Sequence, residues 1–326
     1  MASDEEHESG WQTMESDPGV FDELLRTLGV PLTVDDLYSL DAESLAAIQP
    51  VHAFIFLFKW IGSGESGVAS TNGGEYDDEF TGFFANQVVN NACATIAVIN
   101  GICNIEGLKV GTEIEQLKEF SGALDPQTRG EVITSDNFFR SAHNSLSPPP
   151  SISLAELDIQ REKSGDAYHF IVYLPHRGYI YELDGLKRSP VRHVAYSEGP
   201  EGWTPKAKEV IEARIATYPA GSLHFNLLAI RDDPIPKLEG QLEQAQAEHQ
   251  ADHASALAQQ IALENEKRER WKFENSLRRH NHLRTIHALL LAMASSGRLE
   301  GAMESARQKM KDRIEIARKN KGSGLS

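Results

Sequence analysis

The chain has 326 residues and a formal net charge of −16, and 40% of its residues are hydrophobic. This hydrophobic fraction excludes a wholly disordered chain. Apolar runs such as 51–58 are far short of the roughly 20 residues that a membrane-spanning helix needs. Because the length exceeds that of a usual single domain, we expect one catalytic-sized domain with an appendage and no membrane partner.

The charge is divided unevenly along the chain. Residues 1–239 hold 37 acidic and 17 basic residues, a balance of −20, whereas residues 240–326 hold 11 and 15, a balance of +4. The acidic part repels nucleic acid. The charges of the tail alternate in sign, which favours a solvated helix face over a nucleic-acid patch. We therefore expect no nucleic-acid partner.

The start of the chain and its cysteines indicate a compartment. The first ten residues contain four acidic residues and no Lys or Arg, so they lack the character of a signal or transit peptide. We expect a flexible acidic arm over 1–9 and a location in cytoplasm and nucleus. Cys93 and Cys103 lie ten residues apart in one predicted helix, about 15 Å along its axis, so they cannot bridge each other. Cys103, deep in an apolar stretch, is predicted to be core.

The first predicted elements are a helix, a strand and a second set of helices. Ser16-Asp17-Pro18 precedes a capped amphipathic helix that stops at Gly29 and Pro31. A buried strand is predicted over 51–58 and a surface loop over 62–79. Asn90-Asn91 stands where the helix that bears Cys93 can begin. Two further helices are predicted near 112–121 and 126–146.

A connection of about twenty residues follows, over 147–166, and its length is well beyond the usual median of about 4 to 6. Such loops are functional or disordered. Strands are predicted over 167–174, 179–184, 191–196 and 223–230, with a helix over 205–217. These elements give an α+β pattern. The globular domain is predicted to end at 232–236, and the composition beyond it indicates helices throughout.

The hairpin near residue 176 has two alternative registers. If His176 and Arg177 are its central residues, the numbers of cross-strand partners sum to 353, and His169 faces Asp184 with Cβ atoms about 4.5 to 5.5 Å apart. If Gly178 also belongs to the loop, the sum is 354 and Asp184 turns to the other face unless a bulge compensates. The alternative to a functional pair is that Asp184-Gly185 is only a strand-ending turn and His169 a half-buried strand residue. The pattern alone leaves both registers open.

Cys93 completes a possible nucleophilic site. The unpaired N–H groups at a helix start favour the thiolate form of a cysteine. The Cys93 N–H can also bind an oxyanion, and Gln87, six residues upstream, can supply a second donor from its amide. The alternative is that Cys93 only packs in an apolar helix. The remaining histidines have no metal-ligand spacing, and no nucleotide fingerprint is present, so we expect neither metal nor cofactor.

These residues resemble those of the ubiquitin C-terminal hydrolases, the papain-like cysteine deubiquitinases of peptidase family C12. The matching segments are ESDPGVFDELL, PVHAFIFLFKW, FFANQVVNNACAT, AYHFIVYLPHRGYIYELDGLKRSP and LHFNLLAI. The resemblance implies that Cys93 is the nucleophile, His169 the general base and later acid, Asp184 its orienting partner and Gln87 an oxyanion donor. It also implies hydrolysis, through a thioester, of the amide or isopeptide bond after the terminal glycine of ubiquitin.

The resemblance further implies an α+β papain-like fold, with helices around a central antiparallel sheet, a knotted backbone and an all-helical C-terminal extension. We place the catalytic domain at 10–235, its crossover loop over the active site at about 147–166, and a helical domain for partner docking at 236–326. The segment RRHNHLRTIHALLLAM resembles the C-terminal domain of the long, proteasome-associated member. This implies that ubiquitin conjugates and a proteasomal ubiquitin-receptor subunit are partners. The alternative function is a ubiquitin-binding proteasome adaptor with latent catalysis.

Overall fold

The computed structural model describes residues 10–60, 71–147, 167–197, 202–218, 225–280 and 283–322. The predicted acidic arm over 1–9 and residues 148–166 of the predicted crossover loop lie outside the described residues. The chain divides into two compact units, of which the first includes the described residues up to Arg279 and the second those from His280 onwards. The site residues all lie in the first unit.

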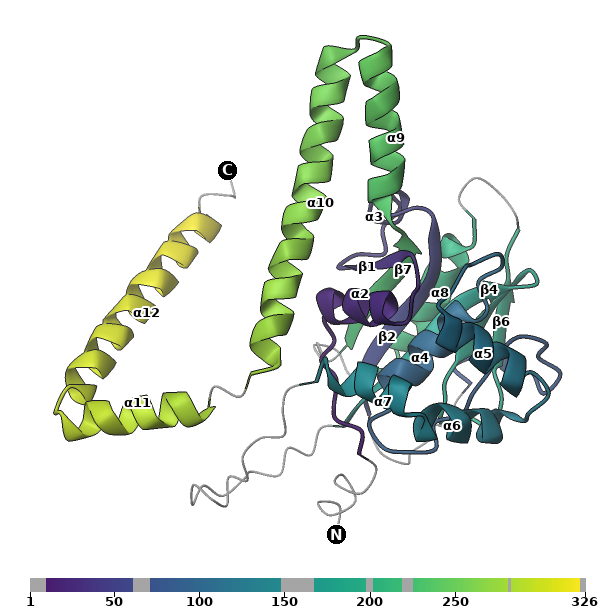
Figure 1. Cartoon of the computed structure of the whole chain (residues 1–326), viewed down its shortest axis with the longest axis horizontal. Coiled ribbons are helices and arrows are strands. Elements are labelled where there is room, and N and C mark those ends of the chain that lie inside the picture. Colours follow the sequence, from purple (N-terminus) through teal and green to yellow (C-terminus); the bar gives the residue numbers. More distant parts are fainter. Residues whose placement is uncertain are drawn as a thin grey trace. The chain divides into compact units, whose positions relative to one another are not determined.

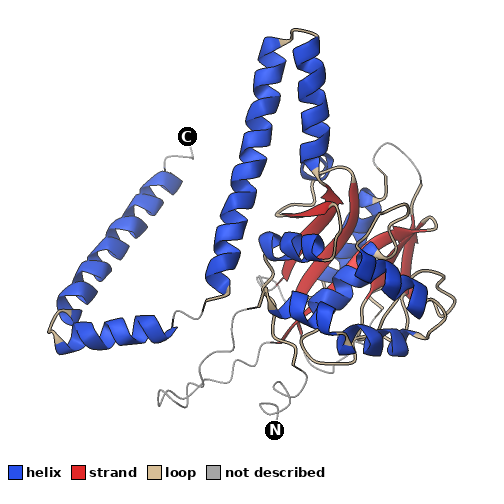
Figure 2. Cartoon of the chain, viewed as in Figure 1, coloured by secondary structure: helices blue, strands red, loops and turns tan. Residues whose placement is uncertain are grey.

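A seven-stranded antiparallel sheet forms the centre of the first unit (Figure 2). Its strands lie in the order β1-β7-β2-β4-β5-β6-β3, so β7, the last in sequence, lies between β1 and β2. Their bounds are β1 Leu32–Asp36, β2 Val51–Trp60, β3 Glu75–Tyr76, β4 Ala167–His176, β5 Tyr179–Leu183, β6 Val191–Ala195 and β7 Phe225–Asp232.

Helices cover both faces of this sheet (Figure 1). Since successive side chains of a strand point to opposite faces, Ile55 of β2 enters one core, whereas Phe54 and Phe56 enter the other. The first core is shared with α2 (Pro18–Thr27), α4 (Cys93–Ile102), α5 (Thr112–Ser121), α6 (Pro126–Ser135) and α7 (Asn137–Asn144). The second core is shared with α3 (Ala42–Ala47) and α8 (Thr204–Ile215). The predicted α+β class is confirmed.

One predicted helix is split in two. The prediction of a single helix over 126–146 is wrong, because the chain leaves helical geometry at Asp136, which lies between α6 and α7. The carboxylate of Asp136 accepts a hydrogen bond from the backbone N–H of Phe138 at 2.6 Å and so caps α7. The aspartate therefore starts a new helix, although the apolar pattern continues through it.

The helices that follow the sheet begin with an antiparallel hairpin, in which α9 (Pro234–Ala247) and α10 (Ala251–Arg278) lie side by side (Figure 1). The far end of α10 packs on α2. The ring of Trp271 lies directly on Gly19, where any added Cβ would come within 2.6 Å of it. The side chain of Asn275 donates to the carbonyl of Gly19 at 2.9 Å. Gly19 thus leaves the space that Trp271 fills.

Ion pairs accompany the packing of α10 on α2. Lys267 pairs with Asp35 at 2.9 Å, and Arg278 pairs with Asp17 at 2.7 Å. The basic residues of 240–326 were predicted to lie on a solvated helix face. Lys267 and Arg278 of α10 instead pair with acidic residues near the start of the chain and neutralise part of their negative charge. The domain boundary predicted at 235/236 accordingly differs from the division by contacts, which lies at Arg279/His280.

The second unit contains α11 (Leu283–Ser295) and α12 (Leu299–Gly322). Its described side chains include Leu289 and Leu291, which are both more than half exposed. Across the described ranges of the chain, no helix combines the length and the apolar character that crossing a membrane requires.

The packing of α10 generates a stability prediction. Trp271→Ala is expected to lower the free energy of unfolding by about 3 kcal/mol, because it removes a buried aromatic side chain. The matched control is Phe273→Ala on the same helix, whose side chain is 63% exposed and whose loss should change that free energy by less than about 0.5 kcal/mol. Urea unfolding of the full chain measures both, and equal effects would contradict the docking of α10.

Candidate active site

A histidine and a carboxylate form a buried pair at the centre of the site. Nε2 of His169 lies 2.6 Å from Oδ1 of Asp184, and the two residues are only 3% and 2% exposed. The backbone N–H of Leu186 also donates to Oδ1 of Asp184, at 3.0 Å. The structure thus brings together the pair that the sequence singled out.

The hairpin that carries this pair has neither predicted register. His176 pairs with Tyr179, so the numbers of cross-strand partners sum to 355, and the predicted sums of 353 and 354 are both wrong. The turn consists of Arg177 and Gly178, with φ values of 47° and 81°. Positive φ at both central residues is the geometry of a type I′ turn, whose twist matches that of the flanking strands.

The observed register still allows the pair to form. A shift of two residues from 353 leaves His169 and Asp184 on the same face of the sheet, because the side-chain period of a strand is two. The ladder between β4 and β5 ends where Val172 pairs with Leu183. Asp184 therefore begins a turn and reaches His169 diagonally, where direct cross-strand pairing was predicted.

The surroundings of His169 favour its charged form. Burial lowers the pKa of the imidazole, but the charge and hydrogen bond of Asp184 and the contact with Cys93 outweigh it and raise the pKa to about 9. The ring of Phe58 meets the imidazole edge-on, with centroids 5.6 Å apart. His169 is therefore a cation at neutral pH and is fixed in orientation.

Cys93 is the first residue of α4 and forms a hydrogen bond with His169. Because Nε2 of His169 is bonded to Asp184, the nitrogen that faces the sulfur is Nδ1. The thiol is partly exposed, whereas Cys103 is buried, and burial raises the pKa of Cys103 to about 12. The two cysteines thus occupy opposite environments, with Cys103 in the core as predicted.

The start of α4 differs from that of several other helices. An aspartate side chain caps each of α2, α3, α6, α7 and α9, but Ala92 precedes α4 and provides no side-chain cap. A carboxylate cap would occupy the N–H groups of the first turn and place a negative charge beside the sulfur. The partial positive charge of this helix end is therefore left to act on Cys93.

Asn91 does not cap the helix, contrary to the prediction that α4 begins at Asn90-Asn91. It has a φ of 67°, a left-handed conformation that asparagine tolerates better than most residues. Its side-chain N–H donates to the carbonyl of Trp11 at 3.1 Å. Asn91 thus anchors the chain just before Cys93 to the N-terminal segment.

Gln87 lies in an irregular segment before α4. Its side-chain Nε2 donates to the carbonyl of Val89 at 3.0 Å, and its backbone N–H donates to the carbonyl of Gly185 at 2.8 Å. Because a carboxamide has two N–H groups, the contact with Val89 orients the amide and leaves the second N–H for another acceptor. Within the described part of the chain, Oε1 of Gln87 is buried without a hydrogen-bond partner.

Asn100 of α4 and Asn104, just after the end of that helix, hold this segment in place. Asn100 bonds both the N–H and the carbonyl of Ala85, at 2.8 and 3.0 Å. Asn104 does the same for Phe83, at 2.8 and 2.7 Å. Backbone groups of a segment without secondary structure are thereby satisfied by the helix that carries the thiol and by the turn that follows it.

Sequence reasoning missed a group of buried charges beside Asp184. Glu182 is completely buried and lies 2.5 Å from Nζ of Lys187 and 2.9 Å from Nη1 of Arg214. Burial raises the pKa of Glu182, but these cations outweigh it and hold the pKa well below its usual range. The spacing of two between Glu182 and Asp184 places both carboxylates on one side of the strand, and that pattern could have indicated a partner cation.

The arrangement offers a partly exposed thiol beside an imidazolium, a carboxylate that orients the imidazolium, and N–H donors near the sulfur. These groups suit acyl transfer through a cysteine nucleophile. In the described part of the chain, no group of three or more His, Cys, Asp and Glu side chains could hold a metal ion.

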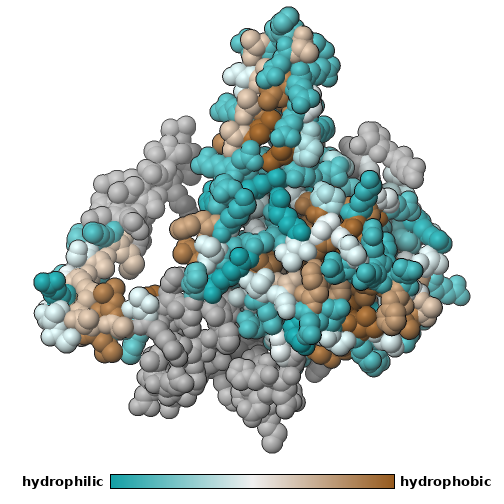
Figure 3. All heavy atoms as spheres, viewed as in Figure 1, coloured by the Kyte–Doolittle hydropathy of each residue, from teal (hydrophilic) through white to brown (hydrophobic). Residues whose placement is uncertain are grey.

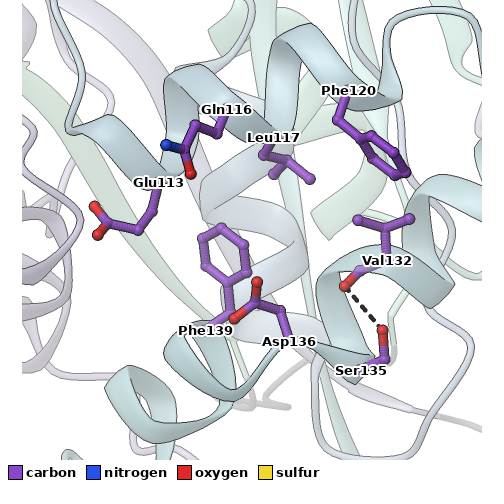
Figure 4. Close-up of a pocket in the computed structure, with 8 residues that line it drawn as sticks. All are labelled: Glu113, Gln116, Leu117, Phe120, Val132, Ser135, Asp136 and Phe139. Atoms are coloured by element: carbon purple, nitrogen blue, oxygen red, sulfur yellow. Dashed lines mark hydrogen bonds between the residues drawn. The ribbon is translucent and has the colours of Figure 1, made fainter.

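A hollow of about 450 Å³ lies elsewhere, between α5, α6 and α7. Leu117 and Phe139 point into it, Phe120 lies opposite Val132, and Glu113 stands at one end (Figure 4). None of the predicted site residues lines this hollow. It is therefore separate from the pair formed by His169 and Asp184.

Comparison with protein-family models gives two matches. Residues 11–216 match the family described as ubiquitin carboxyl-terminal hydrolase, family 1. Residues 254–299 match a second model, described as ubiquitin carboxyl-terminal hydrolases. The first match includes all four predicted site residues.

Similar proteins cover almost the whole chain. The ubiquitin carboxyl-terminal hydrolase ubh-4 of Caenorhabditis elegans is 38% identical over 314 residues, which are 94% of each chain. Ubiquitin carboxyl-terminal hydrolase 2 of Schizosaccharomyces pombe is 39% identical over 274 residues, which cover 83% of this chain and 86% of that one. Trichinella spiralis UCH37, solved bound to ubiquitin vinyl methyl ester, is 32% identical, with a TM-score of 0.64 over 80% of this chain and 99% of that chain.

The electrostatics of His169 can be tested directly. Asp184→Asn removes the charge that raises the pKa of His169 most and leaves the burial that lowers it, so the pKa should fall from about 9. NMR titration of labelled histidines measures this shift. The internal control is His143, whose pKa burial lowers to about 4 and which should titrate alike in both proteins. An unchanged His169 titration would exclude Asp184 as the source of the shift.

Proposed function

The chain belongs to the ubiquitin carboxyl-terminal hydrolases, family 1, and we propose on that basis that Cys93 is the nucleophile of its deubiquitinating reaction. The substrates are ubiquitin conjugates, cleaved at the amide or isopeptide bond after the C-terminal glycine of ubiquitin. The hydrogen-bonded series from Cys93 through His169 to Asp184 carries this proposal. The solved complex of the Trichinella spiralis protein with a ubiquitin ester supports ubiquitin as the ligand.

The first half of the reaction forms a thioester. The proton of the Cys93 thiol is transferred to His169, and the resulting thiolate attacks the carbonyl carbon of the terminal glycine. The backbone N–H of Cys93 and a side-chain N–H of Gln87 stabilise the negative oxygen. His169 then passes its proton to the leaving nitrogen, and the C–N bond breaks. Asp184 keeps the imidazole turned toward both the sulfur and the leaving group.

The second half releases ubiquitin. His169, now neutral, takes a proton from a water molecule that attacks the thioester carbon. The C–S bond breaks, ubiquitin leaves as a carboxylic acid, and the proton held by His169 restores the imidazolium beside the thiolate. The raised pKa of His169 suits this cycle, because the cation is the resting form at neutral pH.

We further propose that the second unit docks the enzyme to a proteasomal ubiquitin-receptor subunit in cytoplasm and nucleus. The match of residues 254–299 to the second family model begins in α10 and extends through α11, so it includes the helix that we propose as the docking surface. Apolar side chains of α11 are exposed to solvent, among them Ile286, Leu289 and Leu290, and apolar atoms gather over this helix in Figure 3. Such a surface is typical of a protein-binding site.

A ubiquitin-binding adaptor with latent catalysis is the second candidate function. The exposed apolar side chains of α11 favour it, because they offer a binding surface that does not involve Cys93. The two candidates differ in whether the thiol reacts.

The nucleophile can be identified with a ubiquitin probe that carries a C-terminal electrophile. We expect Cys93→Ala to abolish labelling and to lower turnover at least about 10⁴-fold, since the residual rate lacks covalent catalysis. Cys103→Ala is the matched control and should be labelled like the natural chain, because the thiol of Cys103 is buried. Labelling that persists in Cys93→Ala would reject the proposed nucleophile, and absence of labelling in the natural chain would favour the adaptor.

Docking can be tested by binding to purified proteasomes. Leu290→Ser in α11 is expected to weaken binding at least about tenfold, as loss of a central apolar contact does, and to leave hydrolysis of a small leaving group intact. The control is Leu263→Ser in α10, which alters a similarly exposed leucine of the first unit. Equal binding by both variants would count against α11 as the docking surface.

A further inference from the structure

Asn86 joins two parts of the site that the sequence separates by about a hundred residues. Its side-chain Nδ2 donates to the carbonyl of Gly185 at 3.1 Å and to the carbonyl of Lys187 at 2.7 Å. Both carbonyls belong to the turn that begins at Asp184. Gln87, the next residue, donates its backbone N–H to Gly185 as well, at 2.8 Å. The oxyanion-donor segment is thus hydrogen-bonded to the carboxylate turn.

The same turn is closed from its other side by buried charges. Nζ of Lys187 lies 2.5 Å from Glu182, and the backbone N–H of Lys187 donates to the carbonyl of Asp184 at 2.9 Å. Both side chains of the ion pair are almost inaccessible to solvent. The ion pair fixes the two ends of the turn, and the amide of Asn86 fixes its outer carbonyl groups.

Two glycines set the position of Asn86 and Gln87. A Cβ on Gly130 of α6 would lie 2.0 Å from the carbonyl oxygen of Asn86, and a Cβ on Gly185 would lie 3.0 Å from the nitrogen of Gln87. The first distance is far inside van der Waals contact. The segment is therefore held between α6 and the turn, at a separation that requires glycine at position 130.

We propose that Asn86 is a positioning residue that keeps the oxyanion donor Gln87 and the carboxylate Asp184 in one rigid unit. This inference rests on the catalytic roles proposed above for Gln87 and Asp184. Asn86 acts through them, because its amide hydrogens are used by the two carbonyls of the turn. A carboxamide has two N–H groups, one for each carbonyl. The carbonyl of Gly185 also accepts from the backbone N–H of Gln87, so the loss of the Asn86 amide affects the contact with Lys187 most.

Substitution at position 86 separates these requirements. Asn86→Asp keeps the shape of the side chain but places acceptor oxygens against two carbonyl oxygens, and it should displace the turn. Asn86→Ala removes both donors without repulsion. We expect kcat for a ubiquitin substrate with a small leaving group to fall about 100-fold in Asn86→Asp and about tenfold in Asn86→Ala, because a misplacement of about 1 Å can cost 100-fold. KM should change less than about threefold.

The pH profile distinguishes positioning from a general loss of stability. Because Asp184 raises the pKa of His169 to about 9, activity should fall above pH 9 as the imidazolium loses its proton. A displaced Asp184 raises that pKa less, so the alkaline limb of kcat should move to lower pH in both Asn86 variants. A loss of folded protein alone lowers the whole profile without moving the limb.

Asn275 of α10 provides the matched control. Its side-chain Nδ2 also donates to two oxygens, the carbonyl of Gly19 and the carboxylate of Glu23, at 2.9 and 2.6 Å, and both acceptors belong to α2. Asn275→Asp should lower the unfolding temperature comparably, leave the alkaline limb in place and change kcat less than about threefold. If Asn86→Asp does not fold, kcat and the alkaline limb of Asn86→Ala are compared with those of the control variant.

The experiment uses the full chain, with Asp184→Asn measured alongside. The proposal is supported if the Asn86 variants lose kcat and shift the alkaline limb while Asn275→Asp does neither. It is overturned if the Asn86 and Asn275 variants lose the same activity without a shift, or if Asn86→Ala retains full kcat. Unchanged turnover in Asp184→Asn would instead reject the catalytic role proposed for Asp184. Failure of the positioning proposal and failure of the proposed function therefore give different results.

Discussion

The hydrogen bond between His169 and Asp184 lies where water is almost excluded, and the site is organised around this condition. A buried carboxylate is costly unless it is paired and hydrogen-bonded. Asp184 meets that requirement with the imidazolium and a backbone N–H. Glu182, two residues before it, meets the same requirement with Lys187 and Arg214. Each of the two carboxylates at the end of β5 thus has cations of its own.

Arg214 connects these two balanced groups through an aromatic ring. Its guanidinium lies 4.2 Å from the centre of the Phe58 ring, and Phe58 in turn meets His169 edge-on. A cation over an aromatic face is attracted by the ring quadrupole, which holds the ring against movement. The imidazole is therefore confined by a carboxylate on one side and by a braced ring on another.

Three kinds of structure supply the site, and each suits its contribution. A helix end offers N–H groups to the sulfur of Cys93. A hairpin supplies His169 from β4 and Asp184 from the turn that follows β5. An irregular segment supplies Gln87, and it needs side-chain amides from Asn100 and Asn104 to satisfy its backbone. Irregular backbone can be placed this accurately only when almost every polar group has a partner.

Features that depend on neighbouring residues were predictable from the sequence, whereas features that depend on the assembled fold were not. Local determinants were sufficient for the helix over 112–121, which appears as α5, and for the cap of α2 at Asp17. The register of the hairpin was predicted wrongly, because Arg177 adopts a left-handed conformation that its residue type does not indicate.

Long-range contacts were out of reach for the same reason. The amide of Asn86 and the ion pair of Glu182 involve partners whose identity depends on the assembled sheet. The boundary at 235/236 rested on composition, and it missed the packing of Trp271 on Gly19 because neither residue carries a local sign of the other.

The position of β7 between β1 and β2 has a consequence for the synthesis of the chain on the ribosome. Two strands made early keep their facing edges unpaired until the seventh strand emerges, and bare edges invite pairing with other chains. The surface of α2 at Gly19 stays uncovered for longer, because Asn275 is synthesised 256 residues later. At 5 to 20 residues per second, this delay is about 13 to 50 seconds. The nascent polypeptide must therefore be shielded throughout almost its entire translation.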